Sequence, residues 1–190
     1  MRKIIVYIAT SADGYIARPD GDVAWLDRPM PKGNYGIAAF YKSVDTVLMG
    51  RKTYEIALKL GQEFYPGKKN YIFSRTRPRS RTPNVEFIDR AIGSFARQLR
   101  RREGKNIWLV GGGELIAAFL DEGQIDEFII HVIPVFIGGG IPLIQPRHRL
   151  VPLSLLSSRS YSDGVIRLRY AVLPQTPKNI KQTSARKRGA

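Results

Sequence analysis

Met49-Gly50-Arg51-Lys52-Thr53-Tyr54-Glu55 follows a short apolar run, and Val110-Gly111-Gly112-Gly113-Glu114-Leu115 follows another apolar run much later in the chain. Each stretch ends a predicted strand and opens a predicted helix. The start of a helix offers free backbone N–H groups and the positive end of the macrodipole, and glycine lets a bulky anion approach the backbone closely. Two such turns in one small chain predict a pair of phosphate sites, which would suit a dinucleotide pyrophosphate.

Strand and helix patterns alternate on both sides of these turns. Strands are predicted at residues 3–10, 44–49, 69–74, 85–88, 106–110 and 126–136, and helices at 35–42, 53–60, 92–102 and 114–120. Segments 153–161 and 165–173 are predicted to form a hairpin that turns at Asp163-Gly164. This order predicts an α/β fold of three layers, with a mostly parallel central sheet, flanking helices and a C-terminal antiparallel hairpin.

The composition limits the domain organisation and the chemistry. With 190 residues, 43% of them hydrophobic, residues 1–173 are predicted to form one domain, and the polar segment 174–190 is predicted to be a disordered basic tail. Cysteine is absent, which excludes disulfides, thiolate metal sites and cysteine nucleophiles and agrees with a cytoplasmic protein. No apolar run is long enough to cross a bilayer, so no membrane partner is expected, and no metal ligand is assigned.

The charge of the chain predicts an anionic partner. Its 31 Lys and Arg residues against 16 Asp and Glu give a net charge of +15. The cations gather in three clusters, at residues 75–81, 97–105 and 178–188. Nucleic acid is one candidate partner, but no recognition-helix motif is present and no aromatic platform interleaves with these clusters. A nucleic-acid-binding protein is therefore ranked below a small-molecule enzyme.

Several further motifs accompany the two turns. They are Ala9 with Asp13-Gly14-Tyr15-Ile16, Trp25, Ser74 and Gly138-Gly139-Gly140-Ile141-Pro142-Leu143. In this order and spacing the set resembles the dihydrofolate reductase superfamily, and most of all the bacterial and archaeal branch that shares the C-terminal reductase domain of the riboflavin enzyme RibD. The resemblance covers about residues 1–173. It implies a dihydrofolate reductase-like fold, an NADPH-dependent reductase and a homodimer, for which strand 128–137 and loop 138–143 would be the contact.

The resemblance also implies where NADPH binds. Ala9 and Ile16 match backbone contacts to the nicotinamide amide, and Ser74 and Arg75 match the strand end beside the adenine ribose, where an arginine pairs with the 2′-phosphate. The remaining phosphates fall on Gly50, Arg51, Lys52 and Thr53, and on Val110, Gly111, Gly112, Gly113, Glu114 and Leu115. The residues alone leave simpler interpretations open. The glycines would serve a tight turn, the cations would be solvated at a helix start or in a basic loop, and Glu114 would cap its helix.

The residues expected around the substrate differ from those of the folate enzymes. Those enzymes hold the pterin with a carboxylate near the start of the first long helix, and segment 34–40 contains no Asp or Glu. A true dihydrofolate reductase is therefore not favoured, and the resemblance to the RibD branch implies 5-amino-6-(5-phosphoribosylamino)uracil as the substrate, with dihydrofolate or a pterin as the alternative; a non-enzymatic NADPH-binding protein also stays open. We assign two catalytic candidates, Asp13 and His131, and three substrate-binding candidates, Asp22, Trp25 and Tyr54. The competing interpretations are a turn residue for Asp13, a loop anchor for Trp25 and core residues for His131 and Tyr54.

Overall fold

The computed structural model describes residues 1–59, 61, 65–76 and 84–174. The strands are β1 (Ile4–Ser11), β2 (Tyr15–Ala17), β3 (Val44–Gly50), β4 (Lys69–Phe73), β5 (Val85–Ile88), β6 (Asn106–Gly111), β7 (Glu127–Ile133), β8 (Ile141–Pro142), β9 (Leu153–Ser160) and β10 (Ile166–Val172). The α-helices are α1 (Ile37–Ser43), α2 (Arg51–Lys59), α3 (Ile92–Arg101) and α4 (Gly113–Asp121), and short 3₁₀ turns cover Ala24–Leu26 and Asn34–Gly36.

The main sheet of the described residues has the order β5-β4-β3-β6-β1-β7-β10-β9, and β2 pairs with β8 in a small second sheet. All neighbours from β5 to β7 are parallel, whereas β10 is antiparallel to both β7 and β9. The prediction of a mostly parallel sheet closed by an antiparallel hairpin is therefore confirmed. The inner strands are buried on both faces, which explains why they read as continuous apolar runs.

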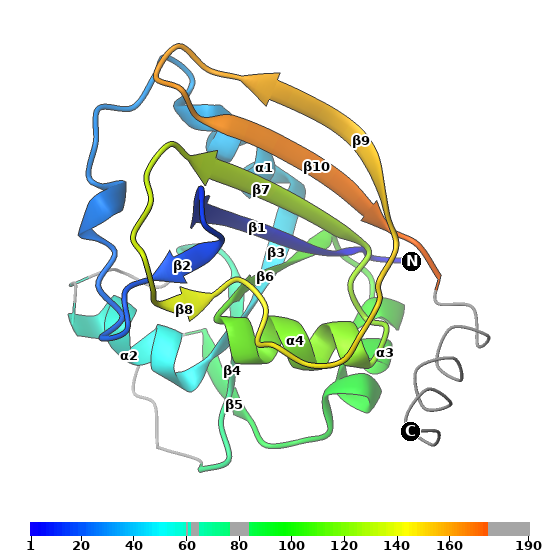
Figure 1. Cartoon of the computed structure of the whole chain (residues 1–190). Coiled ribbons are helices and arrows are strands. Elements are labelled where there is room, and N and C mark those ends of the chain that lie inside the picture. Colours follow the sequence, from blue (N-terminus) through cyan, green and yellow to red (C-terminus); the bar gives the residue numbers. More distant parts are fainter. Residues whose placement is uncertain (60, 62–64, 77–83, 175–190) are drawn as a thin grey trace, which may run out of the picture.

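Helices cover both faces of the sheet and form the outer layers. One core contains Ala96 and Leu99 of α3 with Ile116 and Phe119 of α4, and the core on the other face contains Phe40 of α1 and Tyr54 of α2 among its members. Figure 1 shows α4 and α1 on opposite sides of the sheet. The parallel strands β3, β6, β1 and β7 all end at the same edge, which is where open α/β sheets bind their ligands.

Strand β7 differs from the sequence prediction in length and in setting. It ends at Ile133 rather than at residue 136, because Pro134 has no N–H group to continue the ladder. Both of its edges are occupied, by β1 and by β10, so the backbone of the segment expected to form the dimer contact is not open to a second copy. The outer edge on this side is β9, every residue of which is exposed.

The start of α1 also differs from the prediction. The helix begins at Ile37, after the successive residues Gly33, Asn34, Tyr35 and Gly36, which have φ values of 87°, 43°, 53° and 85°. Such left-handed conformations suit glycine and cost energy at Asn and Tyr. The sequence analysis missed the short strands β2 and β8, which have three and two residues.

Some predictions concern residues that the structure does not describe. The tail at 175–190 and three arginines of the first basic cluster, Arg77, Arg79 and Arg81, lie outside the described residues. Within the described part of the chain, no helix combines the length and the apolar character needed to cross a membrane.

Candidate active site

The two glycine turns predicted from the sequence meet at the edge of the sheet. They follow the neighbouring strands β3 and β6, and Met49 pairs with Gly111 in the ladder. A Cβ atom placed on Gly50 would lie 3.7 Å from the Gly111 carbonyl oxygen and 3.9 Å from the Gly112 nitrogen. A Cβ atom on Gly112 would lie 3.5 Å from Thr53 Oγ1. The missing side chains thus leave a small cradle between two helix starts, which fits the prediction of a site for a pyrophosphate.

Gly113 has a different reason to be glycine. A Cβ atom there would overlap the carbonyl oxygen of Pro142 in β8, so this position is restricted by close packing. The tight-packing interpretation therefore applies to Gly113, whereas Gly50 and Gly112 have room for a methyl group. Val110 is the last residue but one of β6, and Leu115 is a buried residue of α4.

The charged residues of the two turns are paired with each other. Arg51 is hydrogen-bonded to Glu55 at 2.7 Å within α2, and Lys52 Nζ lies 3.5 Å from Glu114 Oε1 at the start of α4. The Lys52 and Glu114 side chains are 77% and 72% exposed, so this ion pair is weak and exchangeable. Glu114 does not form a side-chain cap, because Gly112 is the N-cap residue of α4.

Ser74 and Arg75 follow β4, on the far side of β3 from β6. Ser74 is buried, its N–H donates to the Ile88 carbonyl oxygen at 2.9 Å, and its Oγ accepts from the Thr76 N–H at 3.2 Å. These bonds fix the turn that presents Arg75, whose side chain is exposed. The turn therefore lies at the same edge of the sheet as the cradle, one strand further out.

On the side of β6 away from β3, His131 of β7 lies directly beside Ala9 of β1 in the parallel pair that these two strands form. The His131 ring packs against Tyr7 and Tyr35, with ring centroids 4.8 and 5.8 Å away, and its Nε2 is 3.5 Å from Tyr7 Oη. Burial lowers the pKa of His131, and the charge of Arg167 lowers it further. Burial also raises the pKa of Tyr7 to about 12. At neutral pH the imidazole is therefore uncharged and the phenol keeps its proton.

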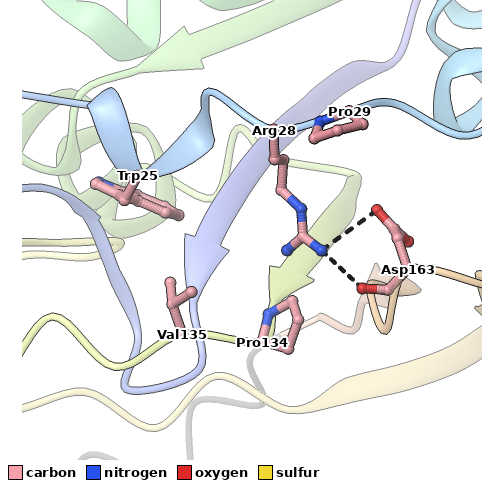
Figure 2. Close-up of a pocket in the computed structure, with 6 residues that line it drawn as sticks. All are labelled: Trp25, Arg28, Pro29, Pro134, Val135 and Asp163. Carbon is pink, nitrogen blue, oxygen red and sulfur yellow. Dashed lines mark hydrogen bonds and ion pairs between the residues drawn. The ribbon is translucent and has the colours of Figure 1, made fainter.

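A cavity of about 510 Å³ opens at the ends of β1 and β7. It is lined by Trp25, Arg28, Pro29, Pro134, Val135 and Asp163. Figure 2 shows Arg28 reaching from the loop before α1 to Asp163 in the hairpin turn. The guanidinium donates to the Asp163 carbonyl oxygen at 2.7 Å and lies 3.7 Å from its carboxylate, which also accepts a hydrogen bond from Tyr35 Oη. A carboxylate thus lines this cavity from the hairpin, whereas segment 34–40 before and within the first helix contains none.

The structure gathers some of the predicted substrate-side residues and separates others. Trp25 lines the cavity, and its buried indole N–H has no hydrogen-bond partner among the residues that the structure describes. Tyr54 lies apart, 7% exposed and edge-on to Phe87 in the core beneath α2. Asp22 accepts a hydrogen bond from the Ala24 N–H at 3.1 Å and stabilises the 3₁₀ turn that carries Trp25.

Asp13 ties two loops together. Its carboxylate accepts hydrogen bonds from Ser11 Oγ and from the N–H groups of Ile137 and Gly138, the last at 2.8 Å. The bond from Ser11 is the main cause that lowers the pKa of Asp13. These contacts fit the interpretation as a turn residue, because an ionised carboxylate that already accepts several hydrogen bonds is a poor proton donor.

Sequence reasoning missed several side chains that surround His131. Tyr7, Tyr35 and Arg167 act on His131 directly, and Tyr161, Asp163 and Arg28 form the next layer through Tyr35 and Asp163. Tyr7 was available from the sequence, because it is two residues before Ala9 on a strand and therefore shares its face. The others come from an irregular loop and from the hairpin, whose position against β7 is a tertiary feature.

Comparisons with known proteins agree with this geometry. The family model described as the RibD C-terminal domain matches residues 2–167. An uncharacterized protein of Bacillus subtilis (strain 168), YwjB, is 41% identical over 165 residues, which are 86% of this chain and 95% of YwjB.

Two solved structures are similar to this chain in fold. A putative riboflavin biosynthesis protein from Shewanella sp. PV-4 is 29% identical with a TM-score of 0.81, covering 90% of this chain and 99% of that protein. Dihydrofolate reductase from Enterococcus faecalis, solved with NADP(H), is 13% identical with a TM-score of 0.66, covering 90% and 97%. The second likeness concerns the fold alone, and together the two confirm the dihydrofolate reductase-like architecture predicted from the sequence.

Proposed function

Because the chain belongs to the RibD C-terminal domain family, we propose that it is an NADPH-dependent reductase of a small nitrogen heterocycle. Family membership supports an oxidoreductase of the kind that acts in riboflavin biosynthesis. Within this class we place 5-amino-6-(5-phosphoribosylamino)uracil first and dihydrofolate or another pterin second. The observation that carries the proposal is the cradle between Gly50, Thr53 and Gly112, where two helix starts converge and a Cβ atom on either glycine would meet its neighbours only at ordinary contact distances.

The chain's own residues fit NADPH at this edge. The backbone N–H groups at the starts of α2 and α4 would hold the pyrophosphate, and Arg51 and Lys52 would exchange their exposed ion pairs for phosphate oxygens. Ser74 shapes the turn from which Arg75 would pair with the 2′-phosphate and favour NADPH over NADH. Ala9 and Ile16 would contact the nicotinamide amide, which brings the reacting end of the cofactor beside His131.

The reaction needs little from the protein beyond alignment and one proton. Bound NADPH supplies a hydride to an electrophilic carbon, such as that of a C=N bond, and the adjacent nitrogen takes up a proton. We assign this proton to the pair of Tyr7 and His131, since both are uncharged at neutral pH and lie beside Ala9. Trp25 would cover the heterocycle in the cavity, whereas Asp13 would position the two loops that frame it.

A cofactor titration tests this function. NADPH and NADH are titrated into the protein at two salt concentrations, and binding is followed by tryptophan quenching. We expect saturable binding that favours NADPH, and Arg75→Ala should weaken NADPH far more than NADH. The exposed Arg101 on α3 offers a control, since Arg101→Ala removes an equal charge away from the cradle. If neither nucleotide binds at either salt concentration, the reductase proposal fails and nucleic acid becomes the next ligand to test.

The proposal includes a cellular location and an oligomeric state for the protein. A cytoplasmic location rests on the cysteine-free composition. A homodimer would now be expected to cover the exposed leucines of β9, since Leu153, Leu155 and Leu156 are 44%, 56% and 49% exposed. Sedimentation that shows only monomer at micromolar concentration would remove the dimer and leave the proposed activity untouched.

A further inference from the structure

The turn before α1 holds a tyrosine in a backbone conformation that is unfavourable for this residue. Tyr35 has φ 53° and ψ 11°, inside the left-handed region, and its neighbours Asn34 and Gly36 have φ values of 43° and 85°. A residue with a Cβ atom loses free energy of folding in this region, and such conformations persist only where surrounding contacts fix them. Contacts from outside the turn must therefore hold Tyr35 in place.

The hairpin turn between β9 and β10 supplies these contacts. Tyr35 Oη donates a hydrogen bond to the Asp163 carboxylate, and Tyr161 Oη donates to the Tyr35 carbonyl oxygen at 3.2 Å. The Tyr161 ring also packs edge-on against the Tyr35 ring, with centroids 5.0 Å apart. The Asp163 carboxylate is itself fixed by the Val165 N–H at 3.3 Å and by the Arg28 guanidinium at 3.7 Å. The hairpin turn thus contacts both the side chain and the backbone of Tyr35.

Tyr35 also contacts the buried imidazole of His131. The two ring centroids are 5.8 Å apart, and the ring planes are inclined by 57°. Burial lowers the pKa of His131, whereas hydrogen bonds to the backbone of Tyr35 and of Ile8 act in the opposite direction; Tyr7 of β1 and Arg167 of β10 also act on the ring. Because His131 is only 4% exposed, solvent does not orient its ring, and Tyr35 is one of the groups that do.

We propose that Tyr35 is a positioning residue that fixes the orientation of the His131 ring beside Ala9 and is itself held by Asp163 and Tyr161. The orientation of an imidazole decides which of its two nitrogen atoms faces a reacting group. The contacts run from the hairpin turn through Tyr35 to His131, so Asp163 acts on His131 without touching it. The positioning can be measured without turnover, and only its catalytic consequence rests on the proposed function.

NMR titration of the two histidines tests the positioning. His131 and the exposed His148 are the only histidines in the sequence, so His148 serves as an internal reference. Tyr35→Phe removes the hydroxyl that donates to Asp163 and keeps the ring. We expect the pKa of His131 to rise toward 6.5 by at least about 0.3, a twofold change in its protonation equilibrium, while the pKa of His148 stays native. The rise follows because burial is the main cause that lowers this pKa, and a released turn admits water to the ring.

Tyr41→Phe is the matched control. Tyr41 lies in α1, and its Oη donates to the Pro66 carbonyl oxygen at 2.8 Å, so this variant also loses one tyrosine hydroxyl and one hydrogen bond. It should leave the pKa of His131 unchanged. Asp163→Ala removes the acceptor instead of the donor and provides a second variant should Tyr35→Phe not fold. Combining Tyr35→Phe with Asp163→Ala should shift the pKa of His131 no further than Asp163→Ala alone, because both changes break the same bond.

The outcomes separate the positioning role from the proposed activity. A native pKa of His131 in Tyr35→Phe and Asp163→Ala, an equal shift in Tyr41→Phe or additive shifts in the double variant would each overturn the positioning role. Turnover by Tyr35→Phe should fall about tenfold, while the Kd of NADPH stays within about twofold of native. If the pKa of His131 shifts as expected and no heterocycle is reduced, the positioning role stands and the reductase proposal falls. Turnover with an unshifted His131 pKa in both variants would remove the positioning role alone.

Discussion

Replacing Gly50 by alanine separates the binding role of the cradle from its role in folding. The new methyl group would have the Gly111 carbonyl oxygen at 3.7 Å, the Gly112 nitrogen at 3.9 Å and Leu115 Cβ at 4.0 Å as its nearest neighbours, all ordinary van der Waals contacts. The free energy of unfolding should therefore not fall. It should rise by up to about 0.4–1 kcal/mol, since alanine restricts the unfolded chain more than glycine does.

The same methyl group occupies the space between the two helix starts. Loss of one charge-assisted hydrogen bond costs about 1.5–3 kcal/mol, so the Kd of NADPH should increase by about 10- to 150-fold. Fluorescence titration gives the Kd, and thermal unfolding gives the stability. Gly139→Ala is the matched control, because its methyl group would meet no atom within 4 Å. Native NADPH affinity in a folded Gly50→Ala protein would refute the assignment of the cradle.

Three further predictions concern Gly113, Asp13 and His131. Gly113→Ala should destabilise the fold by about 1–3 kcal/mol, because its Cβ overlaps the Pro142 carbonyl oxygen, and chemical denaturation measures the loss. Asp13→Asn should lower stability at neutral pH and not in acid. Because the pKa of Asp13 is lowered, its hydrogen bonds to Gly138 and its neighbours contribute fully above the unfolded pKa near 4 and are lost as the pH falls through the folded pKa. In a pH series of unfolding curves, the stabilities of the native protein and the variant should therefore begin to converge below about pH 4. The pKa of His131, measured by an NMR titration, should lie below 6.5, and a value above 6.5 would contradict its buried placement. The free energy of unfolding should decline as the pH falls below about 6.5, because the unfolded chain then binds a proton that the buried imidazole does not bind.

The sequence predicted the parts of the fold that depend on local pattern. Apolar runs ending in glycine gave β3 and β6 with their helices, since the signal lies within a few residues of Gly50 and Gly112. The hairpin of β9 and β10 was likewise visible from its Asp163-Gly164 turn. The long strand predicted to residue 136 was wrong at its end, although Pro134 carried the signal to stop it.

The surroundings of His131 were harder to predict from the sequence, because they depend on the register between distant segments. Whether Arg167 lies beside His131 or one residue away is decided by the pairing of β10 with β7, and a slip by one residue would turn Arg167 to the opposite face. Tyr35 is placed by left-handed backbone angles at Asn34 and Tyr35 that the sequence pattern does not specify. Asp13 and Tyr54 were plausible candidates by residue type, and only their hydrogen bonds and burial show how they are used.

The proposed activity is hydride transfer from NADPH to a nitrogen heterocycle, and an isotope label follows this transfer from the cofactor to the product. NADPH carrying deuterium at both hydrogen positions of nicotinamide C4 is incubated with the protein and with 5-amino-6-(5-phosphoribosylamino)uracil or dihydrofolate, and the product is examined by mass spectrometry. We predict that one deuterium enters the reduced product while an equal amount of NADPH is oxidised. Tight binding of NADPH with no deuterium in either heterocycle would contradict the claim and leave a nucleotide-binding protein without this reductase activity.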